Sequence, residues 1–178
     1  MKQRVKKIIN WILIVAVILV IGFFYAFVRK DRAVFTAPEG LSAYNGHDIV
    51  CDFECSSDML AGMKIQFASN ADKSGTINYY LLDSEGIEAT ESESTKIKSL
   101  KTDKYTLLKL DKIKDSKNKK YTFAISCDNK MDEGVTVLEN TQISYSYIEW
   151  DSETMIVFCL GALYLAGLSK LLMWMFRK

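Results

Sequence analysis

Two long apolar segments lie near the two ends of the chain. Residues 8–28 contain no charged side chain, and residues 155–176 contain a single one, Lys170. As helices, segments of 21 and 22 residues would each extend for about 30 Å, the thickness of the hydrocarbon core of a bilayer. This pattern predicts a transmembrane helix at each end.

The block between them, residues 33–150, follows a different pattern. Apolar and polar side chains alternate in short runs, and clusters of Gly, Asp, Asn and Ser separate the runs. Such alternation is typical of strands that bury one face. The runs lie at 49–55, 63–67, 77–81, 106–110, 121–127, 135–137 and 143–147. We therefore predict an all-β, jelly-roll-like sandwich of about seven or eight strands, flanked by the two helices.

Positive charges next to the apolar segments predict their direction. The first segment is longer than the roughly 7–15 residues of a signal-peptide core, so we expect an uncleaved anchor. Lysine and arginine favour the cytoplasmic side, and residues 1–7 and 177–178 together contain six of them, against three in residues 29–32. We expect a two-pass cell-membrane protein with cytoplasmic tails at 1–7 and 177–178 and an extracytoplasmic sandwich.

Small residues recur four positions apart in both segments. They are Gly22 and Ala26 in the first, and Ala162 and Ala166 in the second. Small residues allow close approach of helices in lipid, so these positions are candidates for packing between the two helices or against a partner. Lys170 either extends its ammonium group to the interface or pairs with an acidic group of another membrane subunit.

The charge of the chain is unevenly distributed. The formal net charge is +1, but residues 33–150 carry 19 acidic side chains against 13 lysines, a formal charge of −6. An acidic domain lacks the basic surface that nucleic-acid binding requires. Residues 101–120 are locally basic, with eight lysines against three aspartates, which indicates either a solvated hairpin or a surface for an anionic polymer or lipid.

Several strand and turn motifs together resemble a known family. They are Gly-Met-Lys-Ile-Gln-Phe at 62–67, the Leu-x-Asp-x-x-Gly turn at 81–86 and the Asp-Ser-Lys-Asn-Lys-Lys-Tyr turn at 115–121. In this order they resemble the extracytoplasmic jelly-roll domains of bacterial membrane proteins of cell-surface glycan assembly, including polytopic glycosyltransferases. The resemblance covers about residues 49–138 and implies a carbohydrate-binding-like fold in a cell envelope. Those proteins have many spans and a catalytic core, whereas this chain has two apolar segments, so the resemblance implies no activity.

Three cysteines share the alternating pattern of the block. Cys51 and Cys55 are four residues apart on one strand, about 13 Å if the strand is straight, which is too far for a mutual disulfide. Either of them can instead pair with Cys127, because an extracytoplasmic compartment permits disulfides. The alternative is that all three are buried thiols.

The sequence offers little to support catalysis. His47 is the only histidine, and it follows Asn-Gly in what is expected to be a turn. No phosphate-binding glycine loop and no zinc-ligand spacing occurs in the sequence. We therefore predict a protein that is not an enzyme, with no metal and no cofactor.

Exposed aromatic rings are the best candidates for ligand contact. Tyr80 and Asn78 fall on the face of their strand opposite Ile77, Tyr79 and Leu81, and Tyr105 is offset from Leu108 and Leu110. A tyrosine that contacts a partner protein would show the same pattern.

Two functions fit these features. One is an accessory subunit of cell-surface polysaccharide assembly or export, whose outer domain binds a glycan. The other is a non-enzymatic membrane scaffold or sensor whose sandwich binds a protein. Both require the bilayer and either a membrane-protein partner or a homo-oligomer.

Overall fold

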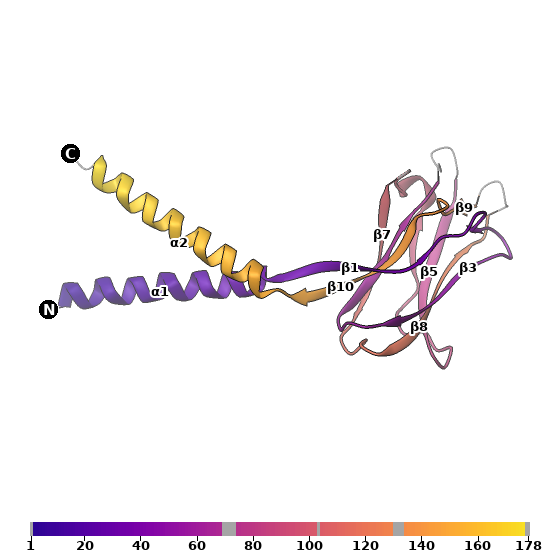
Figure 1. Cartoon of the computed structure of the whole chain (residues 1–178), viewed down its shortest axis with the longest axis horizontal. Helices are drawn as coiled ribbons and strands as arrows, with labels where there is room; N and C mark the ends of the chain where they lie inside the picture. The colour runs from indigo at the N-terminus through magenta and orange to yellow at the C-terminus, as the bar shows by residue number, and fades with distance from the viewer. Residues whose placement is uncertain (1, 69–73, 103, 130–133, 177–178) are drawn as a thin grey trace. The chain divides into compact units, whose positions relative to one another are not determined.

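The computed structural model describes residues 2–68, 74–102, 104–129 and 134–176, and for residues 2–8 and 173 it describes the backbone only. The chain forms two compact units: residues 1–28 with 149–178, and residues 29–148. The expected cytoplasmic end, 177–178, lies outside the described residues. The first unit holds the two long helices and the second holds the sandwich (Figure 1).

The helices are α1 (Lys2–Tyr25) and α2 (Ser152–Met175). The first apolar segment was expected to stay helical through Val28, but α1 ends at Tyr25 and strand β1 begins at Phe27. The reason is that the alternating stretch from Phe27 joins a sheet beside the last strand. At the start of α2, Asp151 caps the helix by accepting a hydrogen bond from the Thr154 backbone N–H at 3.1 Å.

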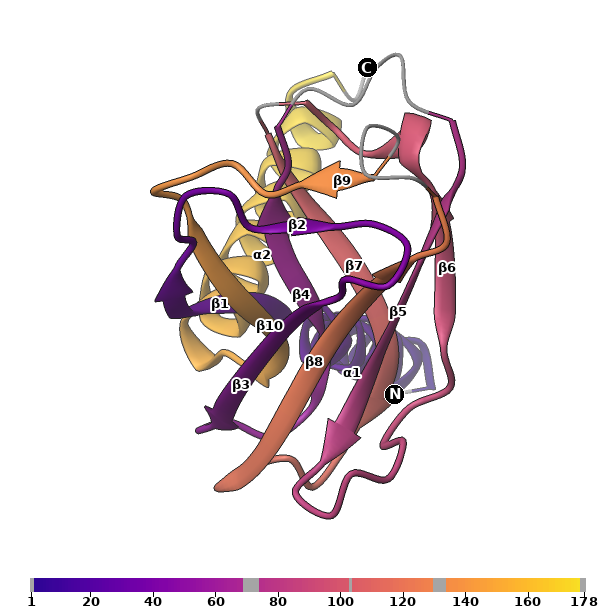
Figure 2. The same ribbon diagram turned by 90° about the vertical axis from the view of Figure 1, so that its right-hand side faces the viewer.

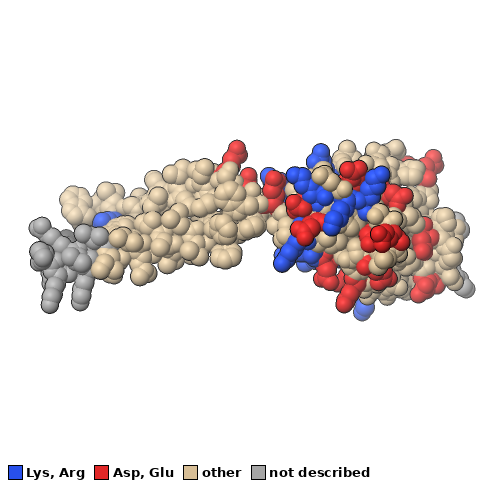
Figure 3. Space-filling model, turned by 90° about the horizontal axis from the view of Figure 1, so that it is seen from below, with Lys and Arg blue, Asp and Glu red and all other residues tan. Residues whose placement is uncertain are grey.

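One described helix is long and apolar enough to cross a membrane: α2, over Ser152–Leu172, with a mean hydropathy of 2.0. The apolar part of α1, Ile9–Tyr25, is shorter. Figure 3 shows that charged side chains gather on the sandwich and are sparse along the helices.

The two helices pack against each other in antiparallel order. A Cβ atom added at Gly22 would lie 3.1 Å from Cys159 Sγ, so α1 and α2 are in close contact there. Tyr25 stacks on Phe158 with ring centroids 5.1 Å apart. Near the other end of the pair, the Lys170 ammonium lies 4.5 Å from the centre of the Trp11 ring.

The small residues expected at this contact differ in their surroundings. Gly22 lies directly at the helix contact. Ala26 is fully buried just beyond the end of α1, whereas Ala162 and Ala166 are half-buried on α2.

Two four-stranded sheets form the sandwich (Figure 2). The first sheet has the order β1-β10-β4-β7 and the second the order β3-β8-β5-β6. The strands of the first sheet are β1 (Phe27–Thr36), β10 (Gln142–Trp150), β4 (Leu60–Gln66) and β7 (Tyr105–Ile113). Those of the second are β3 (Ile49–Cys55), β8 (Lys119–Cys127), β5 (Thr76–Asp83) and β6 (Glu93–Lys96).

Shorter elements complete the domain. Strands β2 (Ser42–Ala43) and β9 (Val135–Thr136) pair with each other, and the 3₁₀ helix η1 (Ile97–Ser99) follows β6. The β4–β7, β4–β10, β3–β8, β5–β8 and β5–β6 pairs are all antiparallel. The prediction of an all-β sandwich is thus confirmed, and the seven alternating runs of the sequence correspond to β3, β4, β5, β7, β8, β9 and β10.

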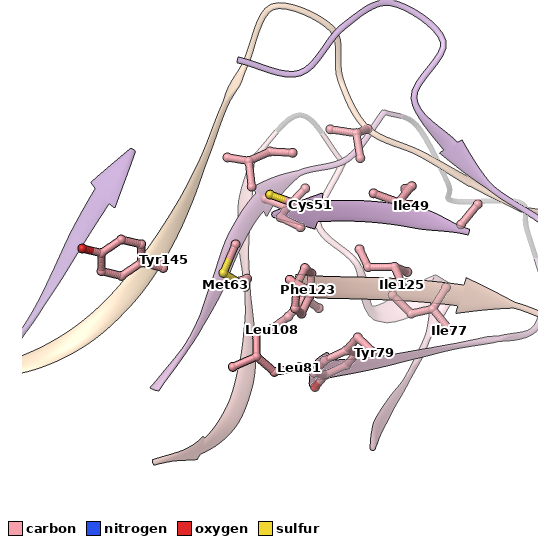
Figure 4. Packing of buried hydrophobic residues seen from close by; sticks show 14 of the residues in the cluster. Ile49, Cys51, Met63, Ile77, Tyr79, Leu81, Leu108, Phe123, Ile125 and Tyr145 are labelled. Carbon is pink, nitrogen blue, oxygen red and sulfur yellow. The ribbon is translucent and has the colours of Figure 1, made fainter. Parts of the chain in front are cut away.

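The inward residues of both sheets build one hydrophobic core. Figure 4 shows Cys51 and Phe123 from the second sheet close to Met63 and Leu108 from the first. On β3 the burial alternates strictly, with Ile49, Cys51, Phe53 and Cys55 buried and the residues between them exposed. This alternation leaves the even-numbered side chains of β3 on the outer face of the second sheet.

Candidate functional site

The structure separates the residues that the sequence proposed for ligand contact. Tyr80 and Asn78 lie on β5, in the second sheet, with their inward neighbours Tyr79 and Leu81 buried. Tyr105 lies on β7, in the first sheet, and is 42% exposed. The two tyrosines are therefore on different sheets of the sandwich and do not form one site.

Cross-strand register places small and apolar neighbours beside Tyr80. Ala124 of β8 lies directly opposite Tyr80 on one side and opposite Val50 of β3 on the other. Val50 is 56% exposed, whereas Ala124 is only 3% exposed although its side chain is a single methyl group. The larger neighbours therefore cover Ala124, as expected if the Tyr80 ring lies along the sheet.

Polar side chains lie on both sides of this row. Asn78 is opposite Ser126 of β8 and Ser94 of β6. In the other direction along the strands, Thr122 of β8 is opposite Asp52 of β3. Residues two apart on a strand share a face. The outward row on one side of Tyr80 therefore carries Asn78 and Ser126, and the row on the other side carries Leu82, Thr122 and Asp52.

A hollow of about 490 Å³ continues this face toward one end of the sandwich. Its rim carries the exposed pair Glu54 and Lys120, which lie opposite each other on β3 and β8. Asp52 and Thr122 also line it, and the Thr122 hydroxyl donates a hydrogen bond of 2.5 Å to Asp52 Oδ1. The hollow thus presents carboxylate acceptors and one ammonium donor close together.

A turn with a defined hydrogen-bond pattern places Ser84 at the same hollow. Asp83 Oδ1 accepts hydrogen bonds from the backbone N–H groups of Glu85, at 2.9 Å, and Ile87, at 3.0 Å. Gly86 adopts φ +78°, which a glycine tolerates best. The Leu-x-Asp-x-x-Gly motif therefore folds as a rigid turn that holds the end of β5.

Tyr105 is already engaged on the outer face of the first sheet. The Lys64 ammonium lies 5.4 Å from the centre of its ring. Lys64 also pairs with Asp31 of β1, and Asp31 in turn accepts a hydrogen bond from Ser146 of β10. These four side chains form a row across all four strands, which we call the Asp31–Tyr105 row.

Electrostatics within this row affect Asp31. Partial burial acts to raise its pKa, but hydrogen bonds from Lys64 and Ser146 and the charges of Lys64 and Arg29 act in the opposite direction. The net effect lowers the pKa of Asp31 below its ordinary value, so the ionised carboxylate is the favoured form.

Of the two alternatives for the sandwich cysteines, the structure has the buried thiols: Cys51, Cys55 and Cys127 are buried and free, and the possible disulfide from Cys51 or Cys55 to Cys127 is not present. Cys51 is opposite Phe123, four residues from Cys127, and Cys55 is opposite Lys119, eight residues from it. Four residues of strand span about 13 Å, beyond the roughly 7 Å that a disulfide can bridge. Burial, together with the nearby Asp52 charge, raises the pKa of Cys51 to about 12.

The single histidine lies in a turn. Its ring stacks on Tyr44 with centroids 5.0 Å apart, and the backbones of Tyr44 and His47 exchange two hydrogen bonds of 2.8 and 2.9 Å. Among the described residues, no group of three His, Cys, Asp or Glu side chains is placed to hold a metal ion.

No protein-family model and no curated protein sequence matches the chain. Among solved structures, the enzymatically active domain of bacteriophage CBA120 tailspike protein 4 aligns with a TM-score of 0.33 and 12% identity, over 72% of this chain and 20% of that one. A carbohydrate-binding module of the β-sandwich superfamily aligns with a TM-score of 0.33 and 15% identity, over 72% of this chain and 58% of that one. This chain thus spans less than two thirds of the length of each of these two solved structures. Likeness at this level assigns no function.

Proposed function

We propose that this chain is a two-pass membrane protein whose extracytoplasmic sandwich binds a glycan, and that it acts as a non-enzymatic accessory subunit in cell-surface polysaccharide assembly or export. In this role the chain inserts into the membrane, binds a saccharide and associates with an assembly or export machine.

Membrane insertion is supported by the helical unit. Most of the described apolar side chains of α2 and of α1 are exposed. Exposed apolar helices of this size are unfavourable in water and favourable in lipid. The positive charges at 1–7 and 177–178 favour cytoplasmic tails.

Saccharide binding is supported by one observation above the others: the half-buried Tyr80 lies on the outer face of the second sheet, with hydrogen-bonding side chains in the outward rows on both sides. Among the described residues, no aromatic stacking and no cation–π contact involves the Tyr80 ring, whereas the Lys64 ammonium lies over the Tyr105 ring. A sugar ring has apolar C–H faces and a polar rim, so a binding surface needs an aromatic ring beside donors and acceptors. Asn78 supplies an amide, and Asp52 a carboxylate, at those positions.

The mode of binding follows from these groups. The sugar lies over Tyr80, displaces water from an apolar surface and directs its hydroxyls to Asn78 on one side and to Asp52 on the other. An exposed carboxylate accepts hydrogen bonds from two hydroxyls at once. Because these side chains lie on strands of one sheet, the backbone that carries them is already ordered. Binding therefore loses little conformational entropy of the protein.

Topology is tested by cysteine labelling from outside intact cells, in a chain whose own cysteines are buried in the sandwich or lie in α2. We expect an impermeant reagent to modify Ser42→Cys and to leave Lys2→Cys and Lys178→Cys unmodified until the cells are opened. The opposite result would place the sandwich in the cytoplasm and exclude a role at the cell surface.

Glycan binding and partnership are tested on the full chain. We expect the protein in lipid nanodiscs to bind members of a printed panel of neutral and acidic oligosaccharides, and a mild-detergent pull-down to recover a glycosyltransferase or a polysaccharide exporter. If the panel gives no binding and the pull-down recovers other membrane proteins, the sandwich is a protein-binding scaffold or sensor instead.

A further inference from the structure

The end of strand β3 lies between two hollows. Asp52, Phe53 and Glu54 line the 490 Å³ hollow of the candidate site, and the same three residues line a second hollow of about 300 Å³ on the other side of the strand. The second hollow is also lined by Arg32 of β1, by Tyr145 of β10 and by Ser56, which follows β3. β1 and β3 are the edge strands of the two sheets, so this hollow opens at an edge of the sandwich.

A hydrogen-bond network fixes the polar floor of the second hollow. The Ser56 hydroxyl is 2.7 Å from the Tyr145 hydroxyl, and the Ser56 backbone N–H donates to that same hydroxyl at 3.1 Å. Tyr145 is 2% exposed, and its ring stacks on Phe53 with centroids 5.5 Å apart. The Arg32 guanidinium donates to the Ser56 hydroxyl, so the network also orients this exposed cation.

Arg32 has donors to spare for a ligand. A guanidinium carries five N–H donors, and the described contacts of Arg32 use one of them, to Ser56. Asp52 and Glu54 stand between Arg32 on one side and Lys120 on the other. Two carboxylates on β3 are therefore flanked by one cation on each side, and the four side chains together carry no net charge.

We infer that the second hollow is a second saccharide subsite, and that one neutral oligosaccharide crosses the end of β3 to occupy both hollows. This inference rests on the proposed glycan binding and specifies its ligand class. Carboxylate acceptors with a cationic donor on each side suit the vicinal hydroxyls of an uncharged sugar, each of which both donates and accepts. A polyanion would gain from Arg32 and Lys120 but would meet the two carboxylates between them.

Two variants test the second hollow by different means. Arg32→Gln removes the donors, and Ala33→Trp fills the hollow from an exposed position of β1 without removing any of the three hydrogen bonds of its floor. Lys109→Gln is the matched control, since Lys109 is an exposed basic residue of β7, at the opposite edge of the sheet from Arg32 of β1. The probes are malto-, cello-, manno- and N-acetylchito-oligosaccharides of two to six units, with oligogalacturonate as the acidic comparison.

In nanodiscs, we expect both variants to weaken binding of the best hexasaccharide about tenfold. Arg32→Gln removes one or two hydrogen bonds from a charged group to the sugar, and Ala33→Trp prevents the sugar from entering the hollow. The effect on the disaccharide should be less than about twofold if it occupies only the first hollow. Lys109→Gln should bind as the unaltered chain does. Raised salt should change the affinity less than about twofold, because the ligand carries no charge.

Failure of this inference is distinguishable from failure of the proposed function. If the unaltered chain binds a hexasaccharide and both variants bind it equally well, the second subsite is wrong while glycan binding stands. Stronger binding of oligogalacturonate than of any neutral probe would overturn the ligand class. If no probe binds the unaltered chain, the proposed glycan binding and this inference are both wrong.

Discussion

The outer faces of the two sheets carry a similar residue in opposite situations. On the first sheet Tyr105 lies under the Lys64 ammonium, in a row that continues to Asp31 and Ser146. On the second sheet Tyr80 has Ala124 and the half-buried Asn78 as its neighbours. An exposed tyrosine in an alternating strand is thus not sufficient to indicate a binding face, because cross-strand neighbours decide whether the ring is already engaged.

The largest effect we expect on the first sheet comes from a glycine beneath the Asp31–Tyr105 row. Gly62 of β4 has φ +155°, and a Cβ atom there would lie 2.4 Å from the backbone oxygen of Leu108 on β7. Gly62→Ala should lower the free energy of unfolding by about 3 kcal/mol, since two paired strands must separate. Urea titration in detergent, read by labelling of the buried sandwich cysteines, measures this.

Gly86, in the turn that ends β5 of the second sheet, is the matched control. It has φ +78°, but nothing lies within 4 Å of an added Cβ. Gly86→Ala should cost only about 1 kcal/mol, from the left-handed backbone conformation alone. Equal effects of the two substitutions would mean that the close approach of β4 to β7 is not tight.

A smaller effect is expected from the ion pair of the row. Asp31→Asn should lower the free energy of unfolding at pH 7 by about 0.5–1 kcal/mol, because the pair is partly exposed and screened by solvent. The folded-state pKa of Asp31 is lowered, so its contribution is complete above the unfolded-state pKa of about 3.9 and is lost as the pH falls through the folded-state value. Urea titrations between pH 3 and 7 should therefore show the difference between variant and unaltered chain disappearing at the acid end.

Lys64→Met tests whether the effect of Asp31→Asn comes from the ion pair between Asp31 and Lys64. It removes the partner of Asp31 and the cation over Tyr105 together, and the double variant with Asp31→Asn should cost less than the two single effects combined. Additive effects would indicate that Asp31 and Lys64 do not interact in solution.

The smallest stability effect concerns the tyrosines. Tyr105→Leu should cost about 0.5 kcal/mol by removing the cation–π contact. Tyr80→Leu should have less effect on stability than Tyr105→Leu, since no described cation lies over the Tyr80 ring. A larger loss at Tyr80 would show that its ring is a structural cover for the sheet.

Sequence periodicity was sufficient for most strands and insufficient for others. Strict alternation such as that of β3 is visible without a structure, because each inward residue is apolar. β1 was missed because Phe27 and Val28 continue an apolar segment and were assigned to the helix. β2 (Ser-Ala) and β6 (Glu-Ser-Thr-Lys) are short and contain no alternating apolar side chains that a period of two could reveal.

The candidate site depends on register, which a single sequence does not reveal. Alternation places Tyr80 and Asn78 outward, as predicted, but it cannot tell that β7 lies in the other sheet from β5. The contacts of Lys120 with β3, and of Arg32 with Ser56, join residues 66 and 24 positions apart in the sequence. The contact between Trp11 of α1 and Lys170 of α2 also joins residues that are distant in the sequence, and nothing in the sequence pattern predicted it.

The most direct test of the central claim compares the two tyrosines as binding residues. The unaltered chain, Tyr80→Ala and Tyr105→Ala are titrated in nanodiscs with the neutral hexasaccharide that the unaltered chain binds best. The account predicts that Tyr80→Ala weakens binding about tenfold or more, a loss of about 1.4 kcal/mol or greater, while Tyr105→Ala changes it less than twofold. Loss of binding in Tyr105→Ala with Tyr80→Ala unchanged, or no binding by the unaltered chain, would contradict it.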